Sequence, residues 1–229
     1  MYSMQYQNAA SLASERSEFI RKVYMNLALG FAGFIALEAF LVSWQPAVDL
    51  AQRMVSGNNW LIVLLAFMGV SWLANSWAIT GATLGKQYAG FALYITAEAV
   101  IFLPLIIFAN SFAPDTIPQA GIITAALTAG ISAYAFFSKK DFSFMGSFLT
   151  IASFVALGII ACAVLFGIQL GLWFSAAMIA FAGLVILYQT SVMIRRYRND
   201  QYVAAALGLF AAIALMFWYI LQFLISSRR

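Results

Sequence analysis

Residues 93–108 read LYITAEAVIFLPLIIF, an apolar run that holds one carboxylate, Glu98. An ionised carboxylate at the centre of a bilayer costs about 2.5–3.5 kcal/mol on insertion scales. If this run spans a membrane, Glu98 must be protonated, be paired or face water. Pro104 follows six residues later and removes a backbone hydrogen bond, which predicts a kink that can open a polar crevice. The pattern favours a carboxylate that handles a cation or a proton.

The same residues allow a second interpretation, in which Glu98 is a neutral hydrogen-bonding group that holds helices together. Its partner would be Asn75, Gln189 or a tyrosine. Glu38 interrupts another apolar run, about 9 Å before Trp44 at the rise of an α-helix, so it either reaches the interface or takes part in ion handling. Asn75 is either an interhelical hydrogen-bonding residue or part of the same pathway. Glu98, Glu38 and Asn75 are therefore the candidates for an ion pathway.

The residue types exclude several other kinds of chemistry. The chain has no histidine and one cysteine, Cys162, which rules out disulfides, Cys/His zinc sites and Ser–His or Cys–His catalysis. Glu38 and Glu98 lie at different predicted depths, so they do not form an acid dyad. We therefore predict no enzyme activity, no cofactor and no metal site. The net charge of +4 comes from short basic clusters between apolar runs, which does not favour binding to nucleic acid.

Composition places these carboxylates in a lipid bilayer. Of the 229 residues, 64% are hydrophobic and 9% are charged, whereas soluble domains are nearer a quarter charged. The apolar runs are continuous, which favours helices over a barrel. We predict an all-α integral membrane protein with a cytoplasmic tail over 1–22, partly helical against the membrane surface, and one seven-helix domain over 23–227. The spans are expected at approximately 23–44, 60–79, 88–109, 116–138, 145–166, 172–193 and 202–226, with the uncharged stretch 142–194 divided at GIQLG (167–171).

Lysine and arginine predict the orientation of the spans, because cytoplasmic loops carry the excess of basic residues. The tail and the even-numbered loops hold nine: Arg16, Arg21, Lys22, Lys86, Lys139, Lys140, Arg195, Arg196 and Arg198. The remaining loops and the C-terminus hold three: Arg53, Arg228 and Arg229. We therefore expect the N-terminus in the cytoplasm and the C-terminus outside. The compact loops favour a bacterial inner membrane, with a eukaryotic internal membrane as the alternative.

Four stretches carry a resemblance to a known family. They read EFIRKVYMNLALGF (18–31), SKKDFSFMGSFLT (138–150), ILYQTSVMI (186–194) and YVAAALGLF (202–210). In this order and spacing they resemble the Bax inhibitor-1 family, the transmembrane Bax inhibitor motif proteins. The second stretch is the most specific, because a short loop with Lys139, Lys140 and Asp141 followed by Phe-Ser and a glycine is unusual. The resemblance implies a bundle of seven helices in which six surround the C-terminal one.

The resemblance also implies a passive leak for Ca²⁺ or protons, gated by an aspartate pair in the last two spans that shares a proton. Here the matching positions hold Gln189 and Ala212, neither of which titrates. A bacterial branch of the family also lacks the pair and is associated with a membrane-anchored AAA protease. The alternative is therefore a regulatory, stress-protective protein that acts through such a partner, with 1–22 and RRYRND (195–200) as the contacts.

Overall fold

The described part of the polypeptide folds into eight α-helices and one short 3₁₀ helix. This computed structural model describes residues 2–80, 83–138 and 140–228, with side chains from residue 14 onward. The elements are α1 (Tyr2–Ser43), α2 (Gln45–Met54), α3 (Asn59–Thr80), α4 (Leu84–Phe112), α5 (Thr116–Phe137), η1 (Ser143–Met145), α6 (Gly146–Phe166), α7 (Leu172–Arg195) and α8 (Tyr202–Ser227). The described residues contain no strand, so the all-α prediction is confirmed.

Seven of these helices are long and apolar enough to cross a membrane: α1, α3, α4, α5, α6, α7 and α8. Large apolar side chains on their outward faces, such as Leu29, Leu65 and Phe154, are more than half exposed, as lipid contact requires. The predicted break at 167–171 is also present. α6 ends at Phe166, and Gly167 takes a φ of +66°, a left-handed conformation that favours glycine. The chain is an integral membrane protein.

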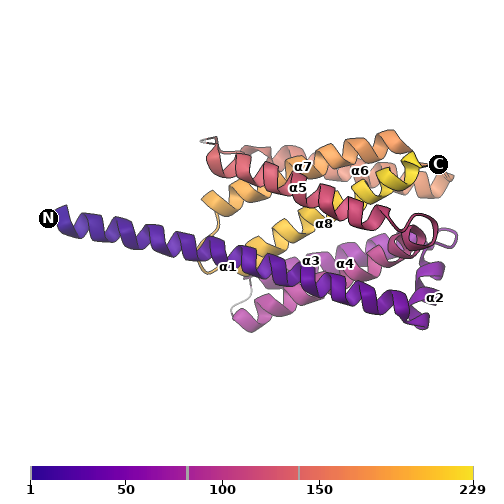
Figure 1. Cartoon of the computed structure of the whole chain (residues 1–229), viewed down its shortest axis with the longest axis horizontal. Helices are drawn as coiled ribbons and strands as arrows, with labels where there is room; N and C mark the ends of the chain where they lie inside the picture. The colour runs from indigo at the N-terminus through magenta and orange to yellow at the C-terminus, as the bar shows by residue number, and fades with distance from the viewer. Residues whose placement is uncertain (1, 81–82, 139, 229) are drawn as a thin grey trace.

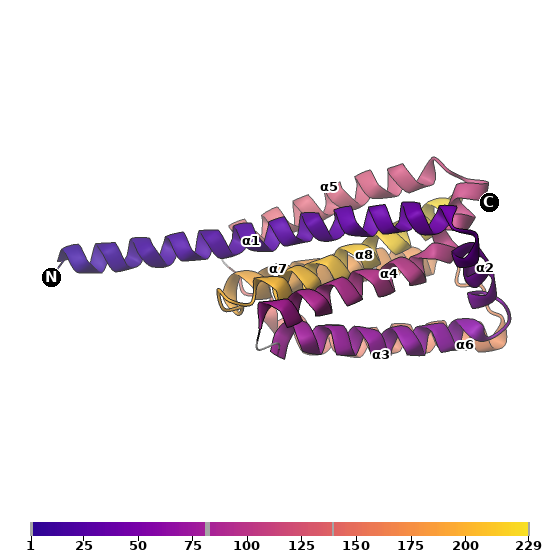
Figure 2. The same cartoon turned by 90° about the horizontal axis from the view of Figure 1, so that it is seen from below.

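Two segments differ from the prediction. α1 is one helix of 42 residues, so the expected tail is continuous with the first span from residue 2 onward. Its N-terminal part projects beyond the bundle (Figures 1 and 2), while Arg16 and Phe19 already pack against the bundle. The segment expected as a loop after the first span forms α2. Trp44 has an extended backbone that ends α1, and Pro46 stands in the first turn of α2, where a missing N–H breaks no helical hydrogen bond. α2 then buries Ala47, Ala51 and Met54 against the bundle.

α8 lies at the centre of the bundle, as the resemblance implies. In its most apolar window 72% of the residues are buried, against 11–39% in the other spans. α8 packs against α1, α3, α4, α5 and α7, while α6 packs against α7 and α3. Small alanines account for much of the close packing, and buried ones on α8 include Ala204, Ala205 and Ala206. We call the end of the bundle with residues 140–142 and 196–201 the tail end, because α1 projects from it (Figure 1).

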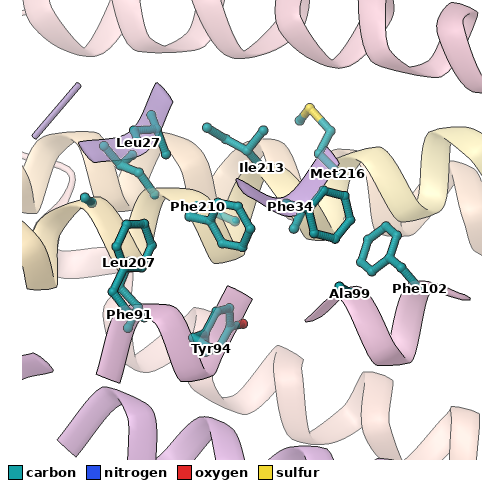
Figure 3. Close-up of a cluster of buried hydrophobic side chains, with 14 of the residues drawn as sticks. Leu27, Phe34, Phe91, Tyr94, Ala99, Phe102, Leu207, Phe210, Ile213 and Met216 are labelled. Carbon is teal, nitrogen blue, oxygen red and sulfur yellow. The ribbon is translucent and has the colours of Figure 1, made fainter. Parts of the chain in front are cut away.

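Aromatic rings attach α8 to the helices that carry the two buried glutamates. Phe210 of α8 is fully buried, and its ring meets Phe34 of α1 edge-on at 6.0 Å between centroids. It meets Phe91 and Tyr94 of α4 in the same way at 5.9 and 6.2 Å. Figure 3 shows these rings converging on Phe210. Each such pair adds about 0.5–1.5 kcal/mol beyond its buried area, so α1 and α4 are held in fixed positions against α8.

Candidate functional site

A cavity of about 1310 Å³ lies between α6 and α8, with further walls from α3, α4 and α7. Along α8 its lining begins at Leu207 and continues to Ser226, nineteen positions later. At 1.5 Å per residue this is about 29 Å. The hydrocarbon core of a bilayer is about 30 Å thick, so the cavity extends through most of the depth of the membrane.

Glu98 of α4 is the one Asp, Glu, Lys or Arg among the described residues that line this cavity. The residue is 6% exposed, and the hydroxyl of Tyr94 donates a hydrogen bond to its carboxylate. Tyr94 lies one turn before Glu98, and Phe102 lies one turn after it. Each of these residues is four positions from the next, so the three share one face of α4. All three line the cavity. The structure thus gives Glu98 both a tyrosine partner and a place on a cavity wall.

The other two pathway candidates are placed differently. Asn75 of α3 lines the same cavity as Glu98. Glu38 of α1 is 7% exposed, so it is buried within the bundle. It is not among the lining residues, and neither of its carboxylate oxygens has a hydrogen-bond partner in the described part of the chain. The structure therefore brings Glu98 and Asn75 to one cavity and leaves Glu38 outside it.

α7 and α8 approach closely at Gln189, one of the two positions where the resemblance described above implies an aspartate. The side-chain oxygen Oε1 of Gln189 lies 2.8 Å from the point where a Cβ on Gly208 would stand. Ala212 is buried one turn further along α8, and all three residues line the cavity. The amide of Gln189 is therefore packed over the bare backbone of Gly208. Gly208 was not among the residues predicted from the sequence, although a glycine within YVAAALGLF is a signal of close helix approach.

Several further polar residues line the cavity that the sequence analysis did not single out. They include Tyr94, Ser153, Ser175, Tyr219, Gln222 and Ser226. Each is a polar residue within or at the end of an apolar run. The sequence alone does not show whether such a side chain points toward lipid or into the bundle. Only the helix packing shows that they converge on one space. They give the cavity neutral hydrogen-bonding groups along its length.

The motif loop after α5 folds back onto the end of α7. Asp141 accepts hydrogen bonds from the Ser143 amide at 2.9 Å and from the Ser191 hydroxyl at 3.4 Å. The Ser191 oxygen in turn accepts from the Phe142 amide at 3.0 Å. Lys139 of the same motif lies outside the described residues. Asp141 and Ser191 therefore fix the loop to α7 two residues after Gln189.

Two arginines donate hydrogen bonds to backbone carbonyl oxygens at the tail end of α7. Arg195 donates to the carbonyl oxygen of Lys140 at 3.1 Å. From α1, Arg16 donates to carbonyl oxygens at and beyond the end of α7, those of Met193, Ile194 and Tyr197, at 2.5, 2.7 and 2.9 Å. The last carbonyls of a helix have no partners within it, and cationic side chains satisfy them. The family-motif loop, the start of the first span and the end of α7 thus form one polar assembly.

We expect Asp141→Asn to lower the melting temperature at neutral pH. The Ser143 amide, followed by Arg196, whose guanidinium lies 3.7 Å away, holds the pKa of the Asp141 carboxyl below its usual 3.8. A carboxyl with a lowered pKa contributes stability that is present above its usual pKa and is lost as pH falls through the folded-state value. The measurement is thermal unfolding of both proteins in one detergent, from about pH 7 down to about pH 3. The melting temperatures of wild type and Asp141→Asn should converge as the pH falls below about 4. A difference in melting temperature that stays constant with pH would show that the charge of Asp141 does not cause the stabilisation.

Comparisons with known proteins place the chain in a family. The family model described as "Inhibitor of apoptosis-promoting Bax1" matches residues 16–229. An uncharacterised protein of Pseudomonas aeruginosa is 29% identical over 97% of this chain and 96% of its own length. Protein lifeguard 4 of Mus musculus is 28% identical over 91% and 85%. The Golgi anti-apoptotic protein of Vaccinia virus is 27% identical over 93% and 87%. With a central α8, six further spans and a match over nearly its whole length, the chain belongs to the Bax inhibitor-1 family.

Proposed function

We propose that this protein is a passive leak pathway for a cation, Ca²⁺ or H⁺, in which the cavity is the conduit and Glu98 attracts the ion. The observation that carries the proposal is the place of Glu98. It is the one residue of a charged type among the described lining residues of a cavity that follows α8 for about 29 Å. A lone negative charge in such a space favours cations over anions.

The composition of the site favours a leak over a tight binding site. No three His, Cys, Asp or Glu side chains of the described residues lie close enough together to hold a metal ion. A Ca²⁺ ion prefers six to eight oxygen ligands, often with several carboxylates. Glu98 with Tyr94, Asn75 and water would supply a set of oxygen ligands that binds Ca²⁺ more weakly. Conduction needs binding that is strong enough for entry and weak enough for exit.

We also propose that the N-terminus lies in the cytoplasm of a bacterial inner membrane and the C-terminus lies outside. Arg16, Lys140 and Arg195 are gathered at the tail end, while Arg53 and Arg228 belong to the opposite end. This distribution supports a cytoplasmic tail end under the positive-inside rule. The end of the cavity with Trp60 would then face the outside, and Gln189 with Gly208 would stand nearest to the cytoplasm.

The test is flux into liposomes that hold the purified protein. We expect Ca²⁺ or protons to enter faster than into protein-free liposomes, down the imposed gradient and without an energy source. Chloride flux in the same liposomes is the control, because the cavity carries a negative charge. Absence of Ca²⁺ and proton flux from correctly folded protein would contradict the proposal.

The second candidate function is regulation of a partner in the membrane, such as a membrane-anchored AAA protease. It is favoured by the neutral pair Gln189 and Ala212 and by the portion of α1 that projects beyond the bundle (Figure 2). A projecting helix offers a surface for another protein at the tail end. This function predicts a complex that can be isolated from native membranes in mild detergent and that is lost when residues 2–13 are deleted. Recovery of the protein alone would count against it.

A further inference from the structure

We propose that the cavity binds lipophilic organic cations, meaning a quaternary or protonated centre that carries apolar substituents. The cationic centre would lie at Glu98 and the substituents against the aromatic walls. The inference shares the Glu98 site with the proposed leak, but it concerns binding and does not need an ion to cross the membrane. It assigns a ligand class to the space between α6 and α8.

The size of the cavity is the first argument. Its volume of about 1310 Å³ exceeds the 300–1,000 Å³ that is usual for sites of drug-sized ligands. A bare ion with a few waters needs far less room. The walls are mainly apolar, and their large aromatic residues come from four helices: Trp60, Phe67 and Trp72 on α3, Phe108 on α4, Phe174 and Phe181 on α7, and Trp218 on α8. Such walls favour an organic substituent over bulk water.

The charge of the cavity is the second argument. Glu98 is the one charged lining residue in the described part of the chain, and the ion pairs recorded there involve other carboxylates. No lysine or arginine among the described residues lines the space. Tyr94 donates one hydrogen bond to Glu98 and brings no positive charge. A cation therefore complements this site, and an anion of the same size would be repelled.

The arrangement of rings around Glu98 is the third argument. Tyr94 and Phe102 stand one turn on either side of Glu98 on the same face of α4. The ring of Trp218 meets Phe102 edge-on, with 4.9 Å between centroids, and stacks with Trp60 at 6.1 Å. Aromatic rings attract cations through their faces, and tryptophan does so most strongly. A cationic centre beside Glu98 would therefore have a carboxylate and aromatic rings within reach, and its substituents would extend toward Trp218 and Trp60.

The experiment compares tetraphenylphosphonium with tetraphenylborate, which have the same shape and opposite charge. Both are titrated into purified protein in nanodiscs, and binding is followed by equilibrium dialysis and by quenching of tryptophan fluorescence. We expect saturable binding of the phosphonium and, beyond the background of empty nanodiscs, none of the borate. Glu98→Gln should weaken phosphonium binding at least tenfold. Asp115→Asn removes an exposed carboxylate outside the cavity and should leave the binding unchanged.

A second variant keeps the inference testable if Glu98→Gln does not fold. Trp218→Leu removes a wall ring while the carboxylate stays, and it should weaken phosphonium binding several-fold. Equal binding of phosphonium and borate, or equal affinity in wild type, Glu98→Gln and Trp218→Leu, would overturn the inference. Binding without any Ca²⁺ or proton flux would remove the proposed leak and leave this inference standing. Flux of Ca²⁺ or protons without phosphonium binding would overturn this inference and leave the proposed leak standing.

Discussion

Glu98→Gln is expected to reduce Ca²⁺ or proton flux into liposomes at least tenfold. The substitution keeps the size of the side chain and can keep the hydrogen bond with Tyr94, but it removes the one charge among the described lining residues. At about 4 Å and an effective dielectric constant of about 20, a carboxylate attracts a monovalent cation by about 4 kcal/mol. A tenfold loss corresponds to about 1.4 kcal/mol, so even partial compensation by water leaves a clear effect. The measurement is initial flux, with equal amounts of each protein in the liposomes.

Two further variants make this result specific. Asp115→Asn removes a carboxylate that is exposed at the start of α5 and does not line the cavity, so it should conduct like the wild type. Glu38→Gln tests the competing carboxylate, which is buried but outside the cavity. If flux persisted in Glu98→Gln and disappeared in Glu38→Gln, the pathway would follow α1 and not the space between α6 and α8.

The architecture of the bundle was largely predictable from charge placement. The spans are continuous apolar runs that end at Lys, Arg or Asp, and a bilayer accepts few other arrangements of such runs. The division at GIQLG followed from length and from two glycines, and Gly167 takes the left-handed conformation that ends α6. α2 was missed because ten residues with Asp49 and Arg53 are too short and too polar to be read as a span. Its helix depends on the face that Ala47, Ala51 and Met54 bury against the bundle, which is a tertiary effect.

The candidate site was predictable only in part. The cost of burying a carboxylate in an apolar run drew attention to Glu98 without any knowledge of its neighbours. The same argument drew attention to Glu38, with less weight, and the structure places Glu38 outside the cavity. What separates the two is the direction in which each helix face points, and this is set by contacts between spans far apart in the sequence. Gly208 and Gln222 were not predicted for the same reason. Gly208 matters because it faces Gln189 of α7, and Gln222 matters because it lines the cavity.

Gly90→Ala is expected to destabilise the protein by about 1–3 kcal/mol, the usual cost of overpacking a tight contact. A Cβ at this position of α4 would stand 2.5 Å from the carbonyl oxygen of Ala74 and 2.9 Å from the Cβ of Trp77, both on α3. The backbone oxygen cannot move away unless the whole of α3 shifts. Ala74 and Ala78 are both buried, as residues are where two membrane helices meet through small side chains. The measurement is the melting temperature in one detergent, which should fall by roughly 2–12 °C.

Gly85→Ala is the matched control, because it makes the same change on the same helix and a Cβ there meets nothing within 4 Å. It should melt at or slightly above the wild-type temperature, since alanine is the better helix former. Gly90 also lies one turn before Tyr94, and Ala74 directly precedes Asn75, so moving α3 away from α4 would displace two residues of the cavity wall. We therefore expect Gly90→Ala, but not Gly85→Ala, to change cation flux. If both variants melted and conducted like the wild type, the close contact of α3 with α4 would be wrong, and the cavity beside Glu98 would need to be redrawn.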